Sequence, residues 1–345
     1  MNSSVPELAE EDLALIHALQ IAPRVSWAEA ARVLGSSPTA LAARWARLRA
    51  AGLAWLTVHS GEQSRDVVAF VDVRVEPSRR TEAIERIARD PRAASVEETA
   101  DGRDLVLTVI VPDYDSLAAF TLDDLPTTPG VRAVNTHVAT KVHRQGADWR
   151  LDALDPEQQA ALREAARHAR SPAPGRIPDS YWPVVQRLAH DGRQNAAEIA
   201  RALGRDPATV RRQVARLLAT DALAFRCEVA GLRTRWPIVC TWFAQVPMTE
   251  LDRAVRSLST LPELRLLVST AGQSNLMFLL WARSAGDLMR IERLVNEKLP
   301  SLRLSESVLT LRTRKRMGWL LDRHGCATGE VVLPHSLLPR WIHTW

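Results

Sequence analysis

Apolar residues recur at helical spacing in three short segments near the N-terminus. The segment EEDLALIHALQ places Leu13, Ile16 and Leu19 on one face, which predicts an amphipathic helix. The segments SWAEAARVLG and SPTALAARWARLRAAG each begin at a serine and end at a glycine, residue types that start and stop helices. The segment LAWLTVHSGEQSRD then predicts a strand and a polar turn.

The same three helices recur at a constant offset of 169 residues, in YWPVVQRLAHDGR, NAAEIARALG and DPATVRRQVARLL. Identical residues stand at matching positions of the two copies without any gap. The pairs include Leu19 and Leu188, Arg24 and Arg193, Glu29 and Glu198, Gly35 and Gly204, Pro38 and Pro207, and Ala46-Arg47-Leu48 and Ala215-Arg216-Leu217. Identities at one offset across three helices predict a duplicated module.

A second kind of segment follows each three-helix module. It reads strand, helix, two strands, helix and strand, from VVAFVDVRV to GVRAVNTHVATKV in the first half. The second half repeats this order from PIVCTWFAQV to LRLSESVLTLRTRKR. Such an order is typical of a ferredoxin-like βαββαβ domain. Between the halves, one helix is predicted from Pro156 to about Arg170, and SPAPG reads as a linker.

The charge is distributed unequally between the two copies. The chain of 345 residues carries a net charge of +5, almost all of its positive charge from arginine. Residues 1–56 contain five basic and five acidic residues, whereas residues 176–226 contain nine basic and five acidic ones. Genome composition alone would explain an arginine-rich chain, so the position of the charge carries more weight than its total. The second copy is the one expected to attract an anionic partner such as DNA.

The third helix of each module has the pattern of a DNA-reading helix. Val210, Val214 and Leu217 fall on one face of the second copy and are expected to pack inward, as are Leu41, Trp45 and Leu48 in the first. A short capped helix after a tight turn can enter the major groove, where arginine bonds guanine edges. The candidate DNA-binding residues are Thr39, Arg44, Arg47, Arg205, Thr209, Arg211, Arg212 and Arg216. The alternative is that these arginines only solvate a helix face.

The segments WAEAARVLGSSPTALAARWARLRAAGLAWL and AAEIARALGRDPATVRRQVARLLATDALAF resemble the Lrp/AsnC family of transcriptional regulators. The resemblance implies a winged helix-turn-helix followed by a ligand-sensing βαββαβ domain, here present twice. It also implies binding of double-stranded DNA and of a small-molecule effector, commonly an amino acid, between sensing domains. Family members dimerise through their sensing sheets and often assemble into larger homo-oligomers.

The family's Gly-x-x-Asp turn before the third strand carries the resemblance into the sensing domains. It corresponds to Gly272-Gln273-Ser274-Asn275 in the second half and to a shifted Asp101-Gly102-Arg103-Asp104 in the first. The resemblance therefore gives six candidate ligand-binding residues: Asp101, Gly102, Asp104, Gly272, Ser274 and Asn275. The alternative for Gly272 is a plain β-turn glycine.

The predicted fold class is α+β, with two winged helix-turn-helix domains and two ferredoxin-like domains in tandem. The predicted domains are winged helix-turn-helix 1 (1–60), ferredoxin-like sensing domain 1 (66–145), a helical linker (146–177), winged helix-turn-helix 2 (178–228), ferredoxin-like sensing domain 2 (234–316) and a C-terminal tail (317–345). We expect the two halves to form a pseudo-dimer within one chain, with Phe70 and Trp242 hidden between the sensing sheets. The tail's Trp319, Trp341 and Trp345 are expected to dock on an apolar surface of this chain or of a partner.

Other classes of protein find little support in the sequence. No apolar run is long enough for a membrane span, and the acidic N-terminus does not resemble a secretory signal, so a cytoplasmic protein is expected. Cys227, Cys240 and Cys326 lack metal-ligand spacing, and no catalytic, metal-binding or cofactor motif stands out, so none of these is predicted. Two alternatives remain: an enzyme similar to sirohaem decarboxylases, although the motif usual there is missing from STAGQSNLMFLLWA, and an adaptor that does not bind DNA.

Overall fold

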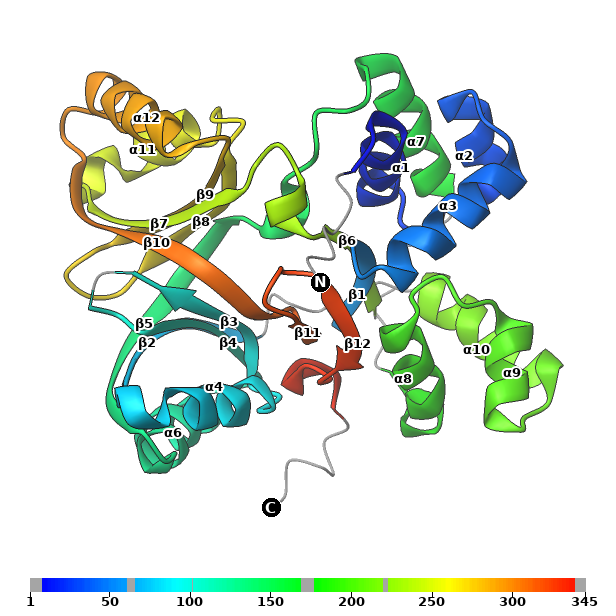
Figure 1. The fold of residues 1–345 in the computed structure, drawn as a ribbon, viewed down its shortest axis with the longest axis horizontal. Coiled ribbons are helices and arrows are strands. Elements are labelled where there is room, and N and C mark those ends of the chain that lie inside the picture. Colours follow the sequence, from blue (N-terminus) through cyan, green and yellow to red (C-terminus); the bar gives the residue numbers. More distant parts are fainter. Residues whose placement is uncertain (1–7, 61–65, 101, 169–176, 220–222, 339–345) are drawn as a thin grey trace, which may run out of the picture.

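The computed structural model describes residues 8–60, 66–100, 102–168, 177–219 and 223–338 (Figure 1). The first half consists of α1 (Glu10–Ile21), α2 (Trp27–Leu34), α3 (Pro38–Ala50), β1 (Ala54–Ser60), β2 (Val67–Val75), α4 (Arg80–Ala88), β3 (Ala93–Thr99), β4 (Leu105–Val111), α5 (Tyr114–Ala118), α6 (Leu125–Thr127) and β5 (Val131–Arg144). Local signals explain the helix ends. The Ser37 hydroxyl accepts a hydrogen bond from the Ala40 amide (3.1 Å), and Gly35 ends α2 at φ 64°.

After α7 (Pro156–His168), the second half has the same order of elements. They are α8 (Trp182–His190), α9 (Ala196–Leu203), α10 (Pro207–Ala219), β6 (Leu223–Val229), β7 (Ile238–Gln245), α11 (Leu251–Leu258), β8 (Leu264–Thr270), β9 (Leu276–Ala282), α12 (Ala285–Lys298) and β10 (Arg303–Arg316). Two short strands, β11 (Trp319–Leu321) and β12 (Ala327–Val331), follow. The mixed helix and strand content agrees with the predicted α+β class.

Eight strands from both halves close into a ring. Their order is β10-β3-β4-β2-β5-β8-β9-β7, and β7 pairs again with β10. Two antiparallel pairings, β5 with β8 and β3 with β10, join the halves, and we call these the seams of the barrel. The helices α4 to α6 lie outside one half of the ring and α11 and α12 outside the other (Figure 1). Closure leaves β3 and β5 without a free edge.

The interior of the barrel is filled by apolar side chains from both halves. Phe70, Val106, Phe243, Val268, Met277 and Val308 form this cluster. Phe70 is 3% exposed and lies there, as expected from the sequence. Trp242 is also buried, but it packs with the helix-facing cluster of its own half, so its expected position between the sheets is wrong. Phe243, one residue on, points into the barrel instead, because successive strand residues face opposite sides.

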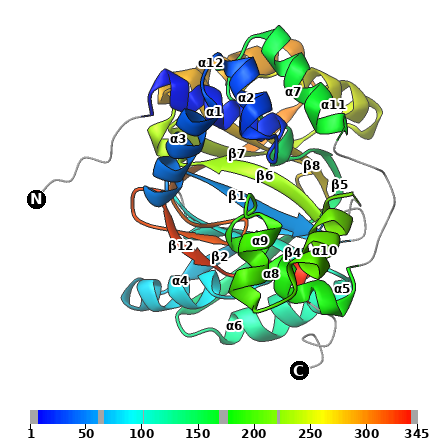
Figure 2. The ribbon, with the colours of Figure 1, turned by 90° about the vertical axis from the view of Figure 1, so that its right-hand side faces the viewer.

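A two-stranded sheet connects the two three-helix units (Figure 2). Here β1 pairs with β6 in antiparallel register, from Ala54 opposite Val229 to Ser60 opposite Leu223. The sequence predicts a separate wing for each unit, whereas the structure has one sheet shared by both. Each strand also contributes residues to both cores. Val229 of β6 lies in the core of the first unit, and Val58 of β1 lies in the core of the second.

A reciprocal arginine contact links the turns between the first and second helices of the two units. Arg193 donates to the carbonyl oxygens of Pro23 (2.7 Å) and Val25 (2.6 Å). Arg24 in turn donates to the carbonyl oxygens of Gly192 and Gln194. These are the two arginines that match at the constant sequence offset. Each unit thus presents the same turn to the other, as in the contact of a two-fold dimer.

The segments expected to be a linker and a tail are both packed. Within the linker, Leu151 and Leu162 belong to the core of the first unit, and Gln20 accepts a hydrogen bond from the Leu151 amide (2.8 Å). In the tail, Trp319 packs in the same core, with its ring 6.3 Å from that of Trp55. Leu337 lies in the core of the second unit. The tail therefore docks on its own chain; Trp341 and Trp345 lie outside the described residues.

Candidate functional sites

The helix α10 presents an arginine-rich face to solvent. It begins where an Asp206 carboxylate oxygen accepts the Thr209 amide (2.7 Å), with Pro207 in its first turn. Val210, Val214 and Leu217 are buried, as predicted, and this orients the remaining face outward.

Arg211, Arg212 and Arg216 are exposed on that outward face. Neither Arg211 nor Arg212 forms an ion pair with a carboxylate in the described part of the chain. Arg212 lies 3.3 Å from the Thr209 hydroxyl, to which it donates a hydrogen bond. Arg205, just before the helix, is exposed and donates to the Ser180 carbonyl oxygen (3.3 Å). The face therefore combines positive charge with hydroxyl and guanidinium donors, the groups that contact phosphates and base edges.

The matching helix α3 has the same buried pattern but its arginines are paired. Leu41, Trp45 and Leu48 are buried, and Thr39 is exposed in the first turn. On the rest of the helix, Arg44 (2.9 Å) and Arg47 (2.6 Å) both donate hydrogen bonds to the carboxylate of Asp12, a buried residue of α1. A carboxylate shared by two arginines cancels part of their charge and fixes their positions.

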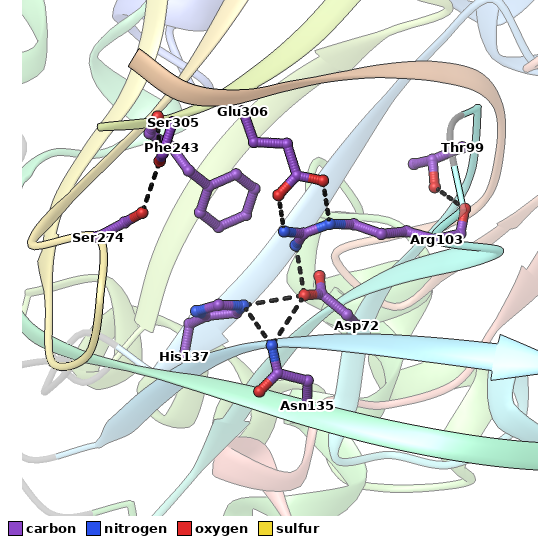
Figure 3. A network of polar contacts seen from close by, with 9 residues as sticks. All are labelled: Asp72, Thr99, Arg103, Asn135, His137, Phe243, Ser274, Ser305 and Glu306. Carbon is purple, nitrogen blue, oxygen red and sulfur yellow. Dashed lines mark hydrogen bonds and ion pairs between the residues drawn. The ribbon is translucent and has the colours of Figure 1, made fainter. Parts of the chain in front are cut away.

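The structure contains a pocket of about 430 Å³ at one mouth of the barrel. It is lined by Asp72, Arg74, Gly102, Arg103, Ala133, Val134, Asn135 and Glu306, which come from β2, the β3–β4 turn, β5 and β10. Residues of both halves therefore form it. In this region Arg103 bridges the halves, since it pairs with Asp72 of β2 and with Glu306 of β10 (Figure 3).

An aromatic ring and two further polar groups complete this cluster. The Arg103 guanidinium lies over the Phe243 ring, 4.4 Å from its centroid. His137 Nε2 lies 2.9 Å from Asp72 Oδ2, and the Asn135 amide donates to the same oxygen (3.4 Å) (Figure 3). Asp72 Oδ2 thus has several partners on one side of the carboxylate.

Two of the candidate ligand-binding residues do not line the pocket, because their side chains form hydrogen bonds with main-chain groups. Asp104 accepts the Val75 amide (2.9 Å), and Asn275 both accepts the Val246 amide (3.0 Å) and donates to the Val246 carbonyl (2.7 Å). Each side chain thereby fixes the end of the first strand in its βαββαβ segment. Asp104 also pairs with Arg80.

The remaining candidates of these turns have different environments. Gly102 lines the pocket and adopts φ +73°, and Gly272 adopts φ +126°, both in the region that favours glycine. Ser274 lies 2.8 Å from the Ser305 hydroxyl. Asp101 lies outside the described residues.

The sequence alone did not single out four residues of this cluster as candidate site residues: Asp72, Arg103, His137 and Glu306. Two features of the sequence could have pointed to them. Arg103 stands inside the turn already singled out, and Asp72 follows Phe70 at strand spacing in VVAFVDVRV, which places a carboxylate on the barrel-facing side.

A buried charge network lies between the barrel and the shared β1–β6 sheet. Glu228 of β6 pairs with Arg226 (2.5 Å) and with Arg265 of β8 (2.7 Å). The Arg265 guanidinium also lies 4.0 Å from the centroid of Trp281. Burial lowers the pKa of Arg265 to about 9, against the attraction of Glu228. Burial alone would raise the pKa of Glu228, but Arg226 and Arg265 hold it below its usual value.

Metal and membrane sites find no support in the described residues. There, no group of three or more His, Cys, Asp and Glu side chains is placed to hold a metal ion. No helix among those residues is long and apolar enough to cross a membrane. The three cysteines are free and buried, and burial raises the pKa of each thiol.

Comparison with protein families gives two matches, both in the N-terminal half of the chain. Residues 8–49 match the AsnC-type helix-turn-helix domain, and residues 68–148 match the Lrp/AsnC ligand-binding domain. The matches cover most of the N-terminal half of the chain, and both are to domains of the Lrp/AsnC type. The resemblance drawn from the sequence is confirmed at this level.

Individual relatives agree with these matches. An uncharacterised HTH-type transcriptional regulator of Pyrococcus horikoshii is 26% identical over 143 residues, covering 41% of this chain and 90% of the relative. The HTH-type transcriptional regulator FL11 of Pyrococcus furiosus is 24% identical over 141 residues, covering 40% of this chain and 93% of the relative.

One solved structure matches almost the whole chain. The siroheme decarboxylase NirDL, in complex with an iron-uroporphyrin III analogue, aligns with a TM-score of 0.54. The alignment covers 97% of this chain and 98% of the decarboxylase at 13% sequence identity. At that identity the match shows a shared fold and nothing about activity.

Proposed function

We propose that this chain is a sequence-specific, DNA-binding transcription regulator. In this proposal α1–α3 and α8–α10 are two helix-turn-helix units of one duplicated chain, and the barrel is formed by two sensing domains. A small-molecule effector that binds at the barrel mouth modulates DNA binding. The single observation that carries the proposal is that Arg211 and Arg212 of α10 pair with no carboxylate among the described residues, whereas Asp12 pairs with both Arg44 and Arg47 of α3.

The pseudo-dimer within one chain is part of the same proposal. Three sets of contacts join one half to the other: the pairing of β1 with β6, the reciprocal contacts of Arg24 and Arg193, and the two seams. These contacts support two DNA-reading helices held in one fixed arrangement. Because the helices differ in charge and sequence, we expect an operator with two unequal half-sites.

The two arginine pairs predict unequal contributions to DNA affinity. Asp12 already neutralises part of the charge of Arg44 and Arg47, whereas Arg211 and Arg212 face solvent. Replacing Arg211 and Arg212 by alanine should weaken binding by about 1–3 kcal/mol for each base-reading arginine. It should also reduce the salt dependence of binding, because fewer counterions are released.

The test is a fluorescence titration at fixed salt on an operator selected from genomic DNA with the purified chain. The double variant Arg211→Ala/Arg212→Ala is compared with Arg44→Ala/Arg47→Ala. The matched control is Arg256→Ala/Arg293→Ala, which removes two exposed arginines from α11 and α12. Equal losses from the α10 and α3 pairs would contradict the asymmetry, and a loss from the control pair alone would contradict DNA binding through these helices.

The shared fold with siroheme decarboxylase makes an enzyme of that kind the second candidate. Uroporphyrin-type substrates carry several carboxylates. The pocket of this chain is lined by the carboxylates of Asp72 and Glu306 and by two arginines, Arg74 and Arg103, of which Arg103 is paired to both carboxylates. Such a lining offers no excess of positive charge to a substrate with several carboxylates. Addition of sirohaem to the purified chain tests this directly, since a bound haem would give a shifted Soret band. Such a band would support the enzyme over the regulator.

A further inference from the structure

The hydrogen-bonding capacity of Arg103 is largely used within the protein. Its Nε donates to Glu306 (2.8 Å), its Nη2 donates to the other oxygen of Glu306, and its Nη1 donates to Asp72 (Figure 3). An anionic ligand would therefore have to displace a carboxylate before it reached this guanidinium. The three groups together carry one net negative charge when ionised, and Arg74, which also lines the pocket, brings the charge of the ionised lining residues to zero.

The carboxylate of Asp72 retains one acceptor without a partner. Its Oδ2 accepts from Arg103 and Asn135 and lies beside His137, whereas its Oδ1 has no hydrogen-bond partner among the described residues. Asp72 is only 7% exposed, so solvent does little to satisfy that oxygen. A buried acceptor without a partner destabilises the protein, and a hydrogen-bond donor entering from the pocket would satisfy it.

The two halves of the barrel mouth differ in chemistry, so the site is single. Asp72 and Phe243 occupy corresponding positions on β2 and β7, and Arg103 and Ser274 occupy corresponding positions in the two turns. The second half therefore offers an aromatic ring and a hydroxyl where the first offers a carboxylate and a guanidinium. We expect one ligand per chain.

From these observations we propose that the pocket binds a small organic cation, a primary amine or diamine, through Asp72 and Glu306. This inference rests on the proposed effector pocket and specifies the chemical class of its ligand. The ammonium group donates to Asp72 Oδ1, the buried oxygen that has no hydrogen-bond partner among the described residues. The pocket volume of about 430 Å³ suits a molecule of this size. A carboxylate in the place of the ammonium group weakens binding, because it meets Asp72 as a like charge.

The experiment compares four probes of similar length on the full-length chain at constant ionic strength. Butylamine and 1,4-diaminobutane are the cations, 1-butanol is the neutral probe and butyrate is the anion. Isothermal titration calorimetry measures affinity and stoichiometry, and thermal unfolding measures the shift in Tm. We expect saturable binding of the cations at one per chain, with binding of butanol and butyrate at least tenfold weaker.

Variants locate the site. Asp72→Asn and, independently, Glu306→Gln should each weaken butylamine binding at least tenfold. The matched control Glu82→Gln, an exposed carboxylate on α4, should leave it unchanged. The proposal is overturned if neither cation binds saturably, if butyrate binds more tightly than butylamine, or if both pocket variants bind like the parent chain.

DNA titrations on the same samples separate this inference from the proposed function. Intact operator binding without amine binding overturns the ligand class alone. Saturable amine binding that depends on Asp72 supports the ligand class, whether or not the chain binds DNA. A chain that binds amine but no DNA would overturn the proposed function and leave the ligand class supported.

Discussion

Replacing Arg193 by alanine should destabilise the chain more than any exposed arginine substitution. The change removes two hydrogen bonds from a charged donor to the carbonyl oxygens of Pro23 and Val25, at 2.7 and 2.6 Å. It also removes the stacking of the guanidinium on Trp27, whose centroid lies 3.8 Å away. Burial, together with the like charge of Arg24, lowers the pKa of Arg193 to about 10, so part of the gain is offset by desolvation.

The two hydrogen bonds, the stacking contact and the desolvation cost together set the expected loss in the free energy of unfolding. Hydrogen bonds to charged groups contribute about 1.5–3 kcal/mol each, and a cation–π contact about 1 kcal/mol. After the cost of desolvation, we expect a loss of about 2–4 kcal/mol in the free energy of unfolding. Arg24→Ala should cost a similar amount, because it removes the reciprocal contact. The double variant should lose more than the sum of the single losses, because each single change already relieves the like-charge repulsion of the pair, and the double variant gains that relief only once.

Urea unfolding followed by tryptophan fluorescence measures the three free energies, with Arg201→Ala, an exposed arginine of α9, as the control. A loss below about 1 kcal/mol for Arg193→Ala would refute the reasoning. So would a double variant whose loss equals the sum of the single losses, because the two side chains would then act independently.

Other predictions follow from the packing and the buried histidines. Trp319→Ala should lower stability by about 3–5 kcal/mol in urea unfolding, because it leaves a cavity beside Trp55; a loss like that of a surface substitution would contradict tail docking. Asn275→Ala should lower Tm by removing both contacts to Val246, and an unchanged Tm would contradict this role. Burial lowers the pKa of His17 and His59 to about 4, so the free energy of unfolding should fall as the pH drops from 6.5 towards 4, because the unfolded chain takes up protons first. Urea unfolding at a series of pH values measures this dependence, and His17→Gln/His59→Gln should flatten it. An unaltered dependence in the variant would assign the effect to other groups. Fragments 1–172 and 173–345 should associate with each other in size-exclusion chromatography, and two separate homodimers would contradict the pseudo-dimer.

Local features of the fold could be predicted from the sequence. The capping residues and the spacing of apolar residues fix where α3 and α10 begin and which faces they bury, because these signals act within a few residues. The pairing of strands across the halves could not be predicted in the same way. Periodicity shows that a strand exists and not which distant strand it joins, so the wing expected for each unit became the shared β1–β6 sheet.

The pocket illustrates a second limit. Asp72, Arg103 and Glu306 come from strands and turns that are far apart in the chain, and each is a single charged residue in an ordinary context. The barrel brings them together only when both seams form. The burial of Trp242 was predicted correctly, but the side of the sheet that it faces was not. A shift of one residue reverses that side, and a run of apolar residues such as IVCTWF does not specify it.

The closed ring has a consequence for how the chain is made on the ribosome. The strand β3 gains its second neighbour only from β10, and β5 only from β8, so both edges stay unpaired until the second half has emerged. The end of β10 leaves the ribosome about 170 residues after the end of β5, which takes on the order of ten to thirty seconds at the usual rates of synthesis. During that interval the nascent first half presents two open sheet edges to other nascent chains and to chaperones. Synonymous codons that slow translation of the second half should therefore lower the soluble yield without changing a single residue.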